Sequence, residues 1–348
     1  MWESLNSTLI ALISKFDNPS TYDNFRPISL CNCIYKIIAK IIANRLNPVL
    51  SLHISPEKFA FLQNRQIHEA VGTSQELLHS VQINNLKGMI LKIDLSKTFD
   101  KVNWLYIRIL LTHLGFPYSF IKWIMCCITN ISYSFLINAF ASPFFHAERG
   151  LRQGCPLSPL LFLLIMEGLS ITLGDEHRQG WIRGIKITDV CTLTHLLFVD
   201  DVLFFLNRGI GDITSFHRTL GIFLKSMGMV LNEAKSTIIA MGFSQHELQF
   251  SLRRYTFAEA SLKEGLRYLD YRLKPHDYKI VDWTWLIAKV ERRMNIWYHK
   301  YFSRLGRLVL IKSILEATPV YWMSLAWIPR GILAHLQNIC HRFLWKGK

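Results

Sequence analysis

Two adjacent carboxylates, Asp200 and Asp201, lie between the short apolar runs Leu197–Val199 and Val202–Leu206. Runs of this length with polar boundaries predict two buried strands, joined as a hairpin with the Asp pair at its turn. Like charges at the edge of an apolar interior repel one another and resist desolvation, and a hard cation such as Mg²⁺ relieves both problems. The alternative is a solvated pair, because Asp is common in turns.

A third carboxylate, Asp94, ends the apolar run Met89–Ile93, which is typical of a buried strand. From the end of a strand it can reach across a sheet to the hairpin turn. We therefore expect Asp94 to share one metal site with the Asp pair. Capping of the next helix is the alternative role, and we assign it instead to Asp100, as the N-cap of a helix over residues 101–113.

Two loops carry groups that could hold a ligand. Gly154 lets the backbone approach a ligand and Gln153 offers an amide, just ahead of an apolar helix expected over residues 160–173. Lys15 and Arg26 flank a short turn, where two cations can grip a phosphate chain. An ordinary Gly-Pro loop and an ordinary surface hairpin are the alternatives.

The spacing of apolar residues predicts the elements that position these groups. Strand character extends over residues 131–147 and 237–241. Amphipathic helices are expected at residues 35–50 and 67–83, and a further helix follows the break at Leu114–Pro117 and ends near residue 128. Helices are also expected at residues 212–227, 304–317 and 331–345, the last two parted by Pro319 and Pro329.

A further helix is expected over residues 281–300. Its apolar face comprises Trp283, Leu286, Ile287, Val290, Met294 and Trp297. The cations Lys289, Arg292, Arg293 and Lys300 lie off that face, so we expect them to be exposed and able to follow a nucleic-acid backbone. A merely solvated charged face is the alternative.

Composition narrows the class of protein. The 348 residues are 50% hydrophobic and 13% aromatic, enough for a large core and against disorder. Net charge is +15, and residues 246–348 hold 18 Lys and Arg against 8 Asp and Glu, which indicates a polyanionic partner. Seven Cys without a CxxC pair favour a reducing intracellular compartment, nucleus or cytoplasm. The longest apolar run, Leu160–Met166, is far below the roughly 20 residues of a membrane span.

Taken in order, these motifs resemble the reverse transcriptase of LINE-type (non-LTR) retrotransposons, of the sort abundant in plant genomes. Several independent motifs in a fixed order are far more specific than one Asp-Asp pair. The matching segments are residues 24–30, 91–104, 149–162, 198–201, 231–236 and 306–322.

The resemblance implies an α+β right-hand polymerase. Fingers and a palm with an antiparallel sheet would occupy residues 1–245, and a basic, Trp-rich helical thumb would occupy residues 246–348. It also implies that Asp94, Asp200 and Asp201 bind two Mg²⁺ ions, with Mn²⁺ as a possible substitute. The implied partners are an RNA template, a DNA primer and dNTPs, without a membrane.

Roles for individual residues follow from the same resemblance. Phe99 matches the aromatic residue that stacks beneath the incoming sugar and excludes a 2′-hydroxyl. Gln153 and Gly154 match the loop that supports nucleotide and template, and Lys15 and Arg26 match fingers residues that grip the triphosphate.

Lys235 matches a lysine proposed to protonate the departing pyrophosphate, a general-acid role. The expected function is thus RNA-directed DNA polymerisation by two-metal nucleotidyl transfer. The alternative is a decayed, inactive retroelement fragment that only binds nucleic acid. A metal-dependent phosphohydrolase is disfavoured, because no His-Asp cluster suggests a water-activating base.

Overall fold

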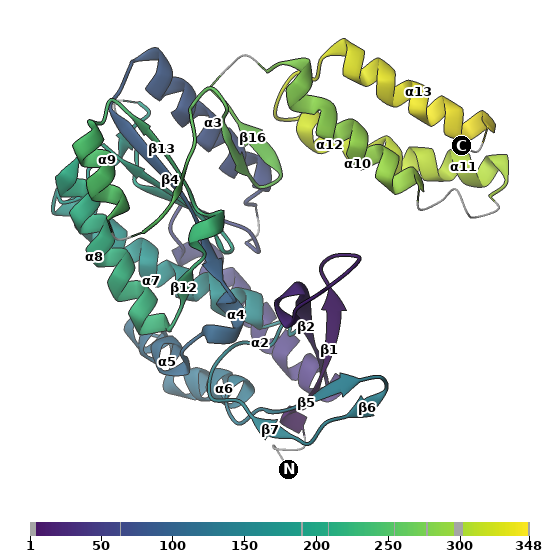
Figure 1. Ribbon diagram of the computed structural model, residues 1–348. Coiled ribbons are helices and arrows are strands. Elements are labelled where there is room, and N and C mark those ends of the chain that lie inside the picture. Colours follow the sequence, from purple (N-terminus) through teal and green to yellow (C-terminus); the bar gives the residue numbers. More distant parts are fainter. Residues whose placement is uncertain are drawn as a thin grey trace. The chain divides into compact units, whose positions relative to one another are not determined.

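The structure, a computed structural model, describes residues 5–62, 64–188, 191–207, 209–253, 255–275, 278–295 and 302–346 (Figure 1). The chain divides into two compact units. Unit 1 comprises Met1–Ile67 and Asn85–Ala260, and unit 2 comprises His68–Asn84 and Ser261–Lys348. The division in the second half of the chain thus follows residue 260, whereas the sequence suggested a boundary after residue 245.

The larger sheet of unit 1 holds the strands that were expected to carry the carboxylates. Its strand order is β14 (Ala258–Glu259), β13 (Thr237–Met241), β4 (Gly88–Ser96), β11 (Asp201–Leu206), β10 (His195–Phe198) and β3 (Lys58–Phe59), and β12 (Val230–Leu231) also pairs with β4. Strand β4 is antiparallel to β11, β12 and β13, and β11 is antiparallel to β10. The centre of this sheet is therefore antiparallel, as expected for the palm.

One face of this sheet packs on a helical layer. The helices that contribute to the core are α2 (Cys33–His53), α5 (Trp104–His113), α6 (Tyr118–Ile128), α7 (Ser158–Arg178) and α8 (Ile210–Met227). On β4 the core residues are Met89, Leu91, Ile93 and Leu95. Because successive side chains of a strand alternate between faces, Lys92 and Asp94 point to the other face, away from this core.

Helix α7 is long and apolar enough to cross a membrane by length and composition. The sequence had suggested no such segment, because its longest unbroken apolar run is short. In the structure 72% of the most apolar window of α7 is buried inside the protein. This helix therefore forms the centre of the unit 1 core, where an all-round apolar helix is expected.

A second sheet in unit 1 carries the basic turn. Its strands are β2 (Phe25–Cys31), β1 (Ser7–Ser14), β5 (Ser132–Ile137) and β6 (Phe140–Ala141), in that order, and β7 (Phe145–His146) also pairs with β5. Strands β1 and β2 form an antiparallel hairpin whose connection includes the short 3-10 helix η1 (Tyr22–Asn24). Lys15 directly follows β1, and Arg26 lies on β2 opposite Ile13.

The expected N-cap at Asp100 is wrong. Asp100 lies inside the short helix α4 (Thr98–Lys101), and α5 begins separately at Trp104. The N-cap of α5 is Asn103, whose side chain accepts a hydrogen bond from the N–H of Leu105 at 2.9 Å. An Asn three residues later thus supplies the cap, which leaves the Asp100 carboxylate free for another partner.

Unit 2 is mainly helical. It contains most of α3 (Ile67–Ile83), the hairpin β15 (Leu266–Tyr268) and β16 (Tyr271–Leu273), the 3-10 helix η3 (Ile280–Trp283), α10 (Thr284–Asn295), α11 (Arg304–Leu310), the π-helix η4 (Ile311–Leu315), α12 (Ala317–Met323) and α13 (Arg330–Lys346). The buried positions at the start of the expected stripe are Trp283, Leu286, Val290 and Met294. Trp297 lies outside the described residues.

The expected helix break at Pro319 does not occur, because Pro319 is the third residue of α12. The first turn of a helix leaves its N–H groups without partners inside the helix, so a proline there removes no intrahelical hydrogen bond. Three helical elements, α11, η4 and α12, thus follow one another up to Met323, and α12 begins as a separate helix at Ala317.

Candidate active site

The hairpin of β10 and β11 places the Asp pair as the sequence predicts. Phe198 pairs with Asp201, so Val199 and Asp200 form a two-residue turn. Val199 has φ of 55°, in the left-handed region that a β-branched residue rarely adopts. The paired strands on both sides impose this conformation on Val199, and such strain is characteristic of functional turns.

Asp94 and Asp201 are direct partners across the antiparallel strands β4 and β11. Side chains of directly opposite residues lie on the same face, so both carboxylates are on the face away from the helical core. The backbone of Asp94 is fixed by a further segment: its N–H donates to Ser236 Oγ at 3.1 Å, and its carbonyl accepts from the N–H of Asn232 at 2.9 Å. Lys235, next to Ser236, is exposed on the 3-10 helix η2 (Glu233–Lys235).

The surroundings of Asp200 disfavour its charged form. Asp200 is solvent-exposed, but its position at the wall of a cavity partly desolvates it, and this burial raises its pKa. The charges of Asp201 and Asp94 raise that pKa further. Asp201 is also 3.5 Å from Lys92 Nζ. Among the described residues, no three acidic, His or Cys side chains are grouped closely enough to hold a metal ion as they stand.

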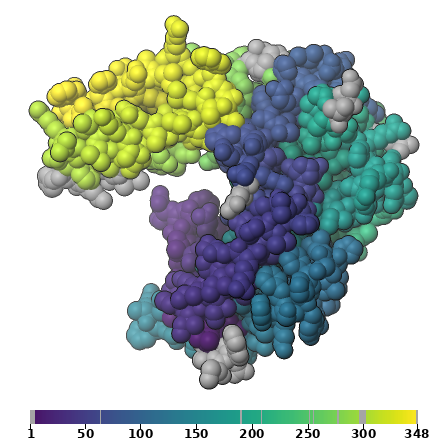
Figure 2. All heavy atoms as spheres, turned by 180° about the vertical axis from the view of Figure 1, so that it is seen from behind, coloured from purple at the N-terminus to yellow at the C-terminus, as the bar shows by residue number. Residues whose placement is uncertain are grey.

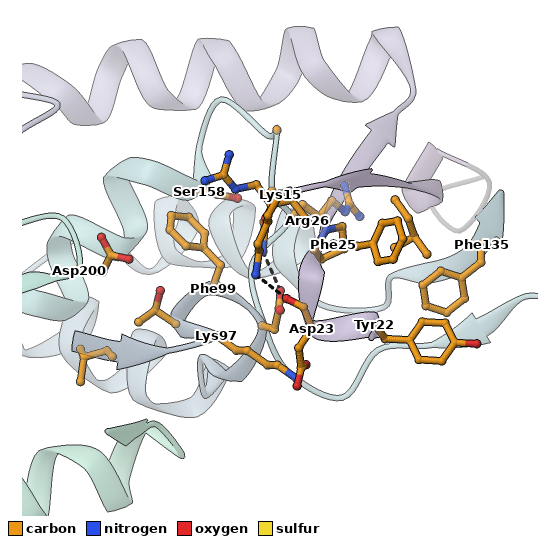
Figure 3. Close-up of a pocket in the computed structure, with 18 of the residues that line it drawn as sticks. Lys15, Tyr22, Asp23, Phe25, Arg26, Lys97, Phe99, Phe135, Ser158 and Asp200 are labelled. Carbon is orange, nitrogen blue, oxygen red and sulfur yellow. Dashed lines mark hydrogen bonds and ion pairs between the residues drawn. The ribbon is translucent and has the colours of Figure 1, made fainter. Parts of the chain in front are cut away.

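A cavity of about 840 Å³ in unit 1 adjoins the hairpin turn (Figure 3). Five of the residues singled out from the sequence contribute to its wall, together with Asp200: Lys15, Arg26, Phe99, Gln153 and Gly154. Asp94 and Asp201 are not part of the wall. The cavity therefore combines cations, an aromatic ring and one carboxylate of the metal-site candidates in a space large enough for a small organic ligand.

Phe99 presents a rigid ring to this cavity. It belongs to α4, five residues after Asp94, and stacks on the fully buried ring of Phe162 of α7 at a centroid distance of 4.9 Å. The Phe99 carbonyl also accepts a hydrogen bond from the N–H of Leu151 at 2.7 Å. The stacking fixes the ring, and the hydrogen bond fixes the backbone that carries it, so Phe99 can act as a flat wall of the cavity. In Figure 3 it lies between Asp200 and the pair formed by Asp23 and Lys97.

The loop of Gln153 and Gly154 is fastened to two neighbouring elements. Gln153 Nε2 donates to Asp100 Oδ1 at 3.1 Å, and the Gln153 carbonyl accepts from the N–H of Ser29 of β2 at 2.8 Å. Gly154 has φ of 100°, and a Cβ there would lie 3.4 Å from the Ser29 carbonyl oxygen. Burial raises the pKa of Asp100, whereas the Gln153 hydrogen bond opposes this effect.

An ion pair and a hydrogen bond hold the tip of the β1–β2 hairpin. Lys97 Nζ is 2.7 Å from Asp23 Oδ1, and Lys15 Nζ donates to the Asp23 carbonyl at 2.8 Å. The Lys97 hydrogen bond is the main reason why the pKa of Asp23 is lowered. Lys97 itself has φ of 49°, a left-handed conformation at the start of α4. All three residues line the cavity, together with the exposed Arg26.

Sequence reasoning missed Lys92, Lys97 and Arg152. Arg152 is 2% exposed, its guanidinium lies 4.1 Å from the Tyr35 ring centroid, and its Nη2 donates to the carbonyl and Oδ1 of Asn6. The sequence gives only a weak indication that each of the three belongs to the site. Lys92 is two residues before Asp94 on the same strand, Lys97 follows that strand, and Arg152 directly precedes Gln153. Only the fold reveals which carboxylate or ring each cation meets.

The four cations expected to follow nucleic acid do not behave alike. Arg292 is exposed, as expected. Lys289 and Arg293 are partly buried, which contradicts that expectation: Lys289 Nζ lies 3.3 Å from Asp270 Oδ2 and 4.7 Å from the Trp322 ring centroid, and Arg293 donates to Thr318. Long side chains near partners of this kind are drawn into structural contacts. Lys300 lies outside the described residues.

Comparison with known proteins connects this geometry to one family. Residues 13–273 match the family described as "Reverse transcriptase (RNA-dependent DNA polymerase)". The "Transposon TX1 uncharacterized 149 kDa protein" of Xenopus laevis is 25% identical over 350 residues, covering 99% of the chain and 26% of that protein. A "Retrovirus-related Pol polyprotein from type-1 retrotransposable element R2" of Popillia japonica is 24% identical over 281 residues, covering 76% of the chain and 44% of the polyprotein. The chain thus spans less than half of either relative.

Solved structures with the same fold include telomerases. The telomerase of Candida tropicalis, solved with a fragment of telomeric RNA, superposes with a TM-score of 0.53 and 14% identity, covering 97% of the chain and 54% of the telomerase. The Candida albicans enzyme, also with a telomeric RNA fragment, gives a TM-score of 0.52 and 11% identity, covering 96% and 57%. At these identities the similarity establishes the fold, that of a right-hand polymerase.

Proposed function

The chain belongs to the reverse transcriptase (RNA-dependent DNA polymerase) family, and we propose that it is the core of an enzyme that adds deoxynucleotides to a primer 3′-hydroxyl on an RNA template. The observation that carries this proposal is the cavity with Phe99, Gln153 and cations on its wall, which adjoins the turn bearing Asp200. A nucleoside triphosphate needs these three features together: a base and sugar surface, cations for its phosphates, and carboxylates near the reacting phosphorus.

The reaction forms one bond and breaks one bond. The primer 3′-oxygen attacks the α-phosphorus of the bound dNTP and its proton passes to water. The bond from the α-phosphorus to the bridging oxygen breaks, which releases pyrophosphate. Reverse transcriptases generally use divalent metal ions. Asp94, Asp200 and Asp201 fit Mg²⁺ or Mn²⁺ because they are oxygen donors whose mutual repulsion a cation would relieve. Bound there, the ions would favour ionisation of the hydroxyl and neutralise charge on the phosphates.

The other groups would position the nucleotide. Lys15, Arg26 and Lys97 supply positive charge for the triphosphate, and the fixed ring of Phe99 stacks against the sugar, where a 2′-hydroxyl would collide with it. Gln153, fastened to β2 and α4, supports the nucleotide from another side. Lys235 would give a proton to the pyrophosphate, and its attachment next to Ser236 keeps it near the backbone of Asp94.

The proposed partners are an RNA template, a DNA primer and dNTPs. Positive charge in the protein, net +15, favours binding of the polyanionic duplex. Of the three described cations proposed on α10, the exposed Arg292 is the one available for a phosphate contact, since Lys289 and Arg293 engage neighbouring side chains.

Primer extension tests the proposal. The purified chain, a primer annealed to an RNA template, dNTPs and Mg²⁺ should give extended DNA. The variant Asp200→Asn should extend the primer far more slowly, whereas the matched control Asp175→Asn should extend normally, because Asp175 lies on α7 in an exposed pair with Arg178. Extension that is unaffected by Asp200→Asn would refute the assigned site.

A second candidate function is nucleic-acid binding without polymerisation. The carboxylates do not form a ready metal-binding group, and Asp201 is close to Lys92 instead. If this candidate is correct, the chain will bind an RNA–DNA duplex with ordinary salt dependence but will extend no primer at any Mg²⁺ or Mn²⁺ concentration.

A further inference from the structure

Helix α2 of unit 1 has apolar residues on two opposite sides. Its inner side packs in the core through Tyr35, Ala39, Ile42, Ala43, Leu46 and Leu50. Its outer side nevertheless exposes further aliphatic side chains: Ile34 is 55% exposed, Ile37 60%, Ile41 49% and Leu52 83%. A helix that is apolar all round is normally covered on all sides, so this outer side lacks a covering element in the described chain.

The exposed residues are arranged as one stripe. Ile34, Ile37 and Ile41 are spaced by three and four residues, which places them in a row along one side of the helix. This is the spacing by which one helix packs against another through interlocking side chains. Figure 2 shows the dark purple to indigo segment that contains α2 at the surface of unit 1.

The stripe leads into a hollow at the start of the helix. A depression of about 590 Å³ is lined there by Ile34, by Leu9 and Leu30 of the neighbouring strands, and by Phe144. Leu30 is 46% exposed and Phe144 59% exposed, so the hollow is open and mainly apolar, with Ser7, Thr8 and Asn32 as its polar lining. Stripe and hollow together form a continuous apolar surface of the kind that receives a partner.

The charges beside the stripe are all of one sign. Helix α2 contains Lys36, Lys40 and Arg45 and no Asp or Glu, and all three cations are exposed. At 100° per residue, Lys40 lies on one flank of the stripe and Arg45 on the other. In paired helices the residues at these flanking positions choose the partner by charge, so the flanks select acidic residues.

We propose that the outer side of α2 is a docking surface for an acidic amphipathic α-helix of a partner protein. The apolar stripe would bury the partner's apolar face, and Lys40 and Arg45 would pair with Glu or Asp beside it. Two copies of α2 would bring cations against cations, which disfavours a symmetric dimer of this chain through the surface. Aliphatic side chains neither donate to phosphates nor stack on bases, so the stripe is equally unsuited to nucleic acid.

The test uses two designed helical peptides of about 21 residues with the same Leu heptad positions. One carries Glu at the flanking positions and the other carries Lys. Binding of each labelled peptide to the full chain is measured by fluorescence anisotropy at physiological salt. The Glu peptide should bind at least tenfold more tightly than the Lys peptide.

Variants identify the surface. Ile37→Asp combined with Ile41→Asp should weaken binding of the Glu peptide at least tenfold, whereas the matched control Ile222→Asp should not, because Ile222 is equally exposed on α8. Lys40→Glu combined with Arg45→Glu should reverse the preference in favour of the Lys peptide. Circular dichroism confirms that each variant is folded.

Four outcomes would overturn the proposal. They are no binding of the Glu peptide, equal binding of both peptides, unchanged binding by the Ile37 and Ile41 variant, and an unreversed preference in the charge-reversed variant. Self-association or RNA binding that is lost in the Ile37 and Ile41 variant would assign the surface to another partner. None of these measurements depends on polymerase activity.

Discussion

The cavity side of the site and its acidic side are held in place by different kinds of contact. On the cavity side, Phe99 stacks on Phe162 and Gln153 bonds to Asp100 and β2. On the acidic side, the strands fix the backbone of Asp94 and Asp201, but Asp201 lies near Lys92 and the three carboxylates do not form a group.

This difference has a simple electrostatic origin. Aromatic and amide groups can be satisfied by other parts of the protein, so the cavity wall can be completed during folding. The charged form of Asp200, by contrast, is disfavoured mainly by burial and secondarily by the charges of Asp201 and Asp94, and its raised pKa reflects both causes. A bound cation would relieve them. The cavity side is thus completed by contacts within the protein, whereas under the proposed function the acidic side would be completed by a metal ion.

The largest effect is expected from Asp200→Asn. It removes a carboxylate from the acidic side, so primer extension should fall by roughly 10²–10³-fold, the usual loss for a group that stabilises transition-state charge. In the absence of metal the same change removes repulsion, so the melting temperature at neutral pH should rise slightly. A fall in melting temperature without metal would show that Asp200 is not under electrostatic strain.

The sequence predicts the acidic side well because strand patterns are local. The apolar runs around Asp94 and the Asp pair specify β4, β10 and β11, and alternation then brings Asp94 opposite Asp201. The expected common site of the three carboxylates is supported only by the backbone, which pairs Asp94 with Asp201 and places Asp200 at the adjoining turn. How closely the three carboxylate side chains approach one another depends on the contact between Lys92 and Asp201 and on a bound cation. The strand pattern indicates neither of them.

On the cavity side, residue types indicated two ligand-holding loops, but only the resemblance connected them with each other and with Phe99. No local rule indicates that Phe99 meets Phe162, 63 residues later, or that Lys97 meets Asp23 of another sheet. The capping error at Asp100 has a local cause, because α4 ends at Lys101 and a separate helix begins after Asn103. Lys289 and Arg293 were expected to be exposed because their partners, Asp270 and Thr318, are distant in sequence.

The next largest effect tests whether the cavity wall is rigid. Phe99→Val should reduce discrimination against ribonucleotides by roughly 10- to 100-fold, because a smaller side chain leaves room for the 2′-hydroxyl. Use of deoxynucleotides should change little. The measurement is kcat/KM for matched ribo- and deoxynucleotides in primer extension. Unchanged discrimination would remove Phe99 from the sugar site, and Tyr118→Val, on the exposed surface of α6, is the control.

A smaller effect is expected from Lys92→Met on the acidic side. Without Lys92, Asp201 is released toward the other carboxylates, so Mg²⁺ should bind about tenfold more tightly, the size expected for a group next to a metal ligand. Isothermal titration with Mg²⁺ measures this change. Lys87→Met is the control, because Lys87 pairs with Glu247 and with none of the three carboxylates.

The pH dependence of Mg²⁺ affinity sharpens the same test. Burial and the neighbouring charges raise the pKa of Asp200, so at low pH the ion must displace a proton from it. Affinity should therefore increase as pH rises through that pKa and then level off once Asp200 is ionised. An affinity that is independent of pH from mildly acidic to neutral conditions would exclude Asp200 as a ligand.

The smallest effect concerns the contact between Asp23 and Lys97 on the cavity side. The Asp23 carboxylate pairs with the Lys97 ammonium group and so competes with a dNTP phosphate for it. Asp23→Asn should therefore lower the KM for dNTPs, and Lys97→Met should raise it. Both side chains are well exposed, so water and salt screen the pair and we expect changes of roughly two- to fivefold, smaller at high salt. Asp17→Asn, in the same loop, is the control for a general loss of charge, and kcat should stay constant in all three variants. A higher KM for Asp23→Asn would mean that Asp23 helps to shape the hairpin tip for dNTP binding. Asp23 would then not compete with the phosphates for Lys97.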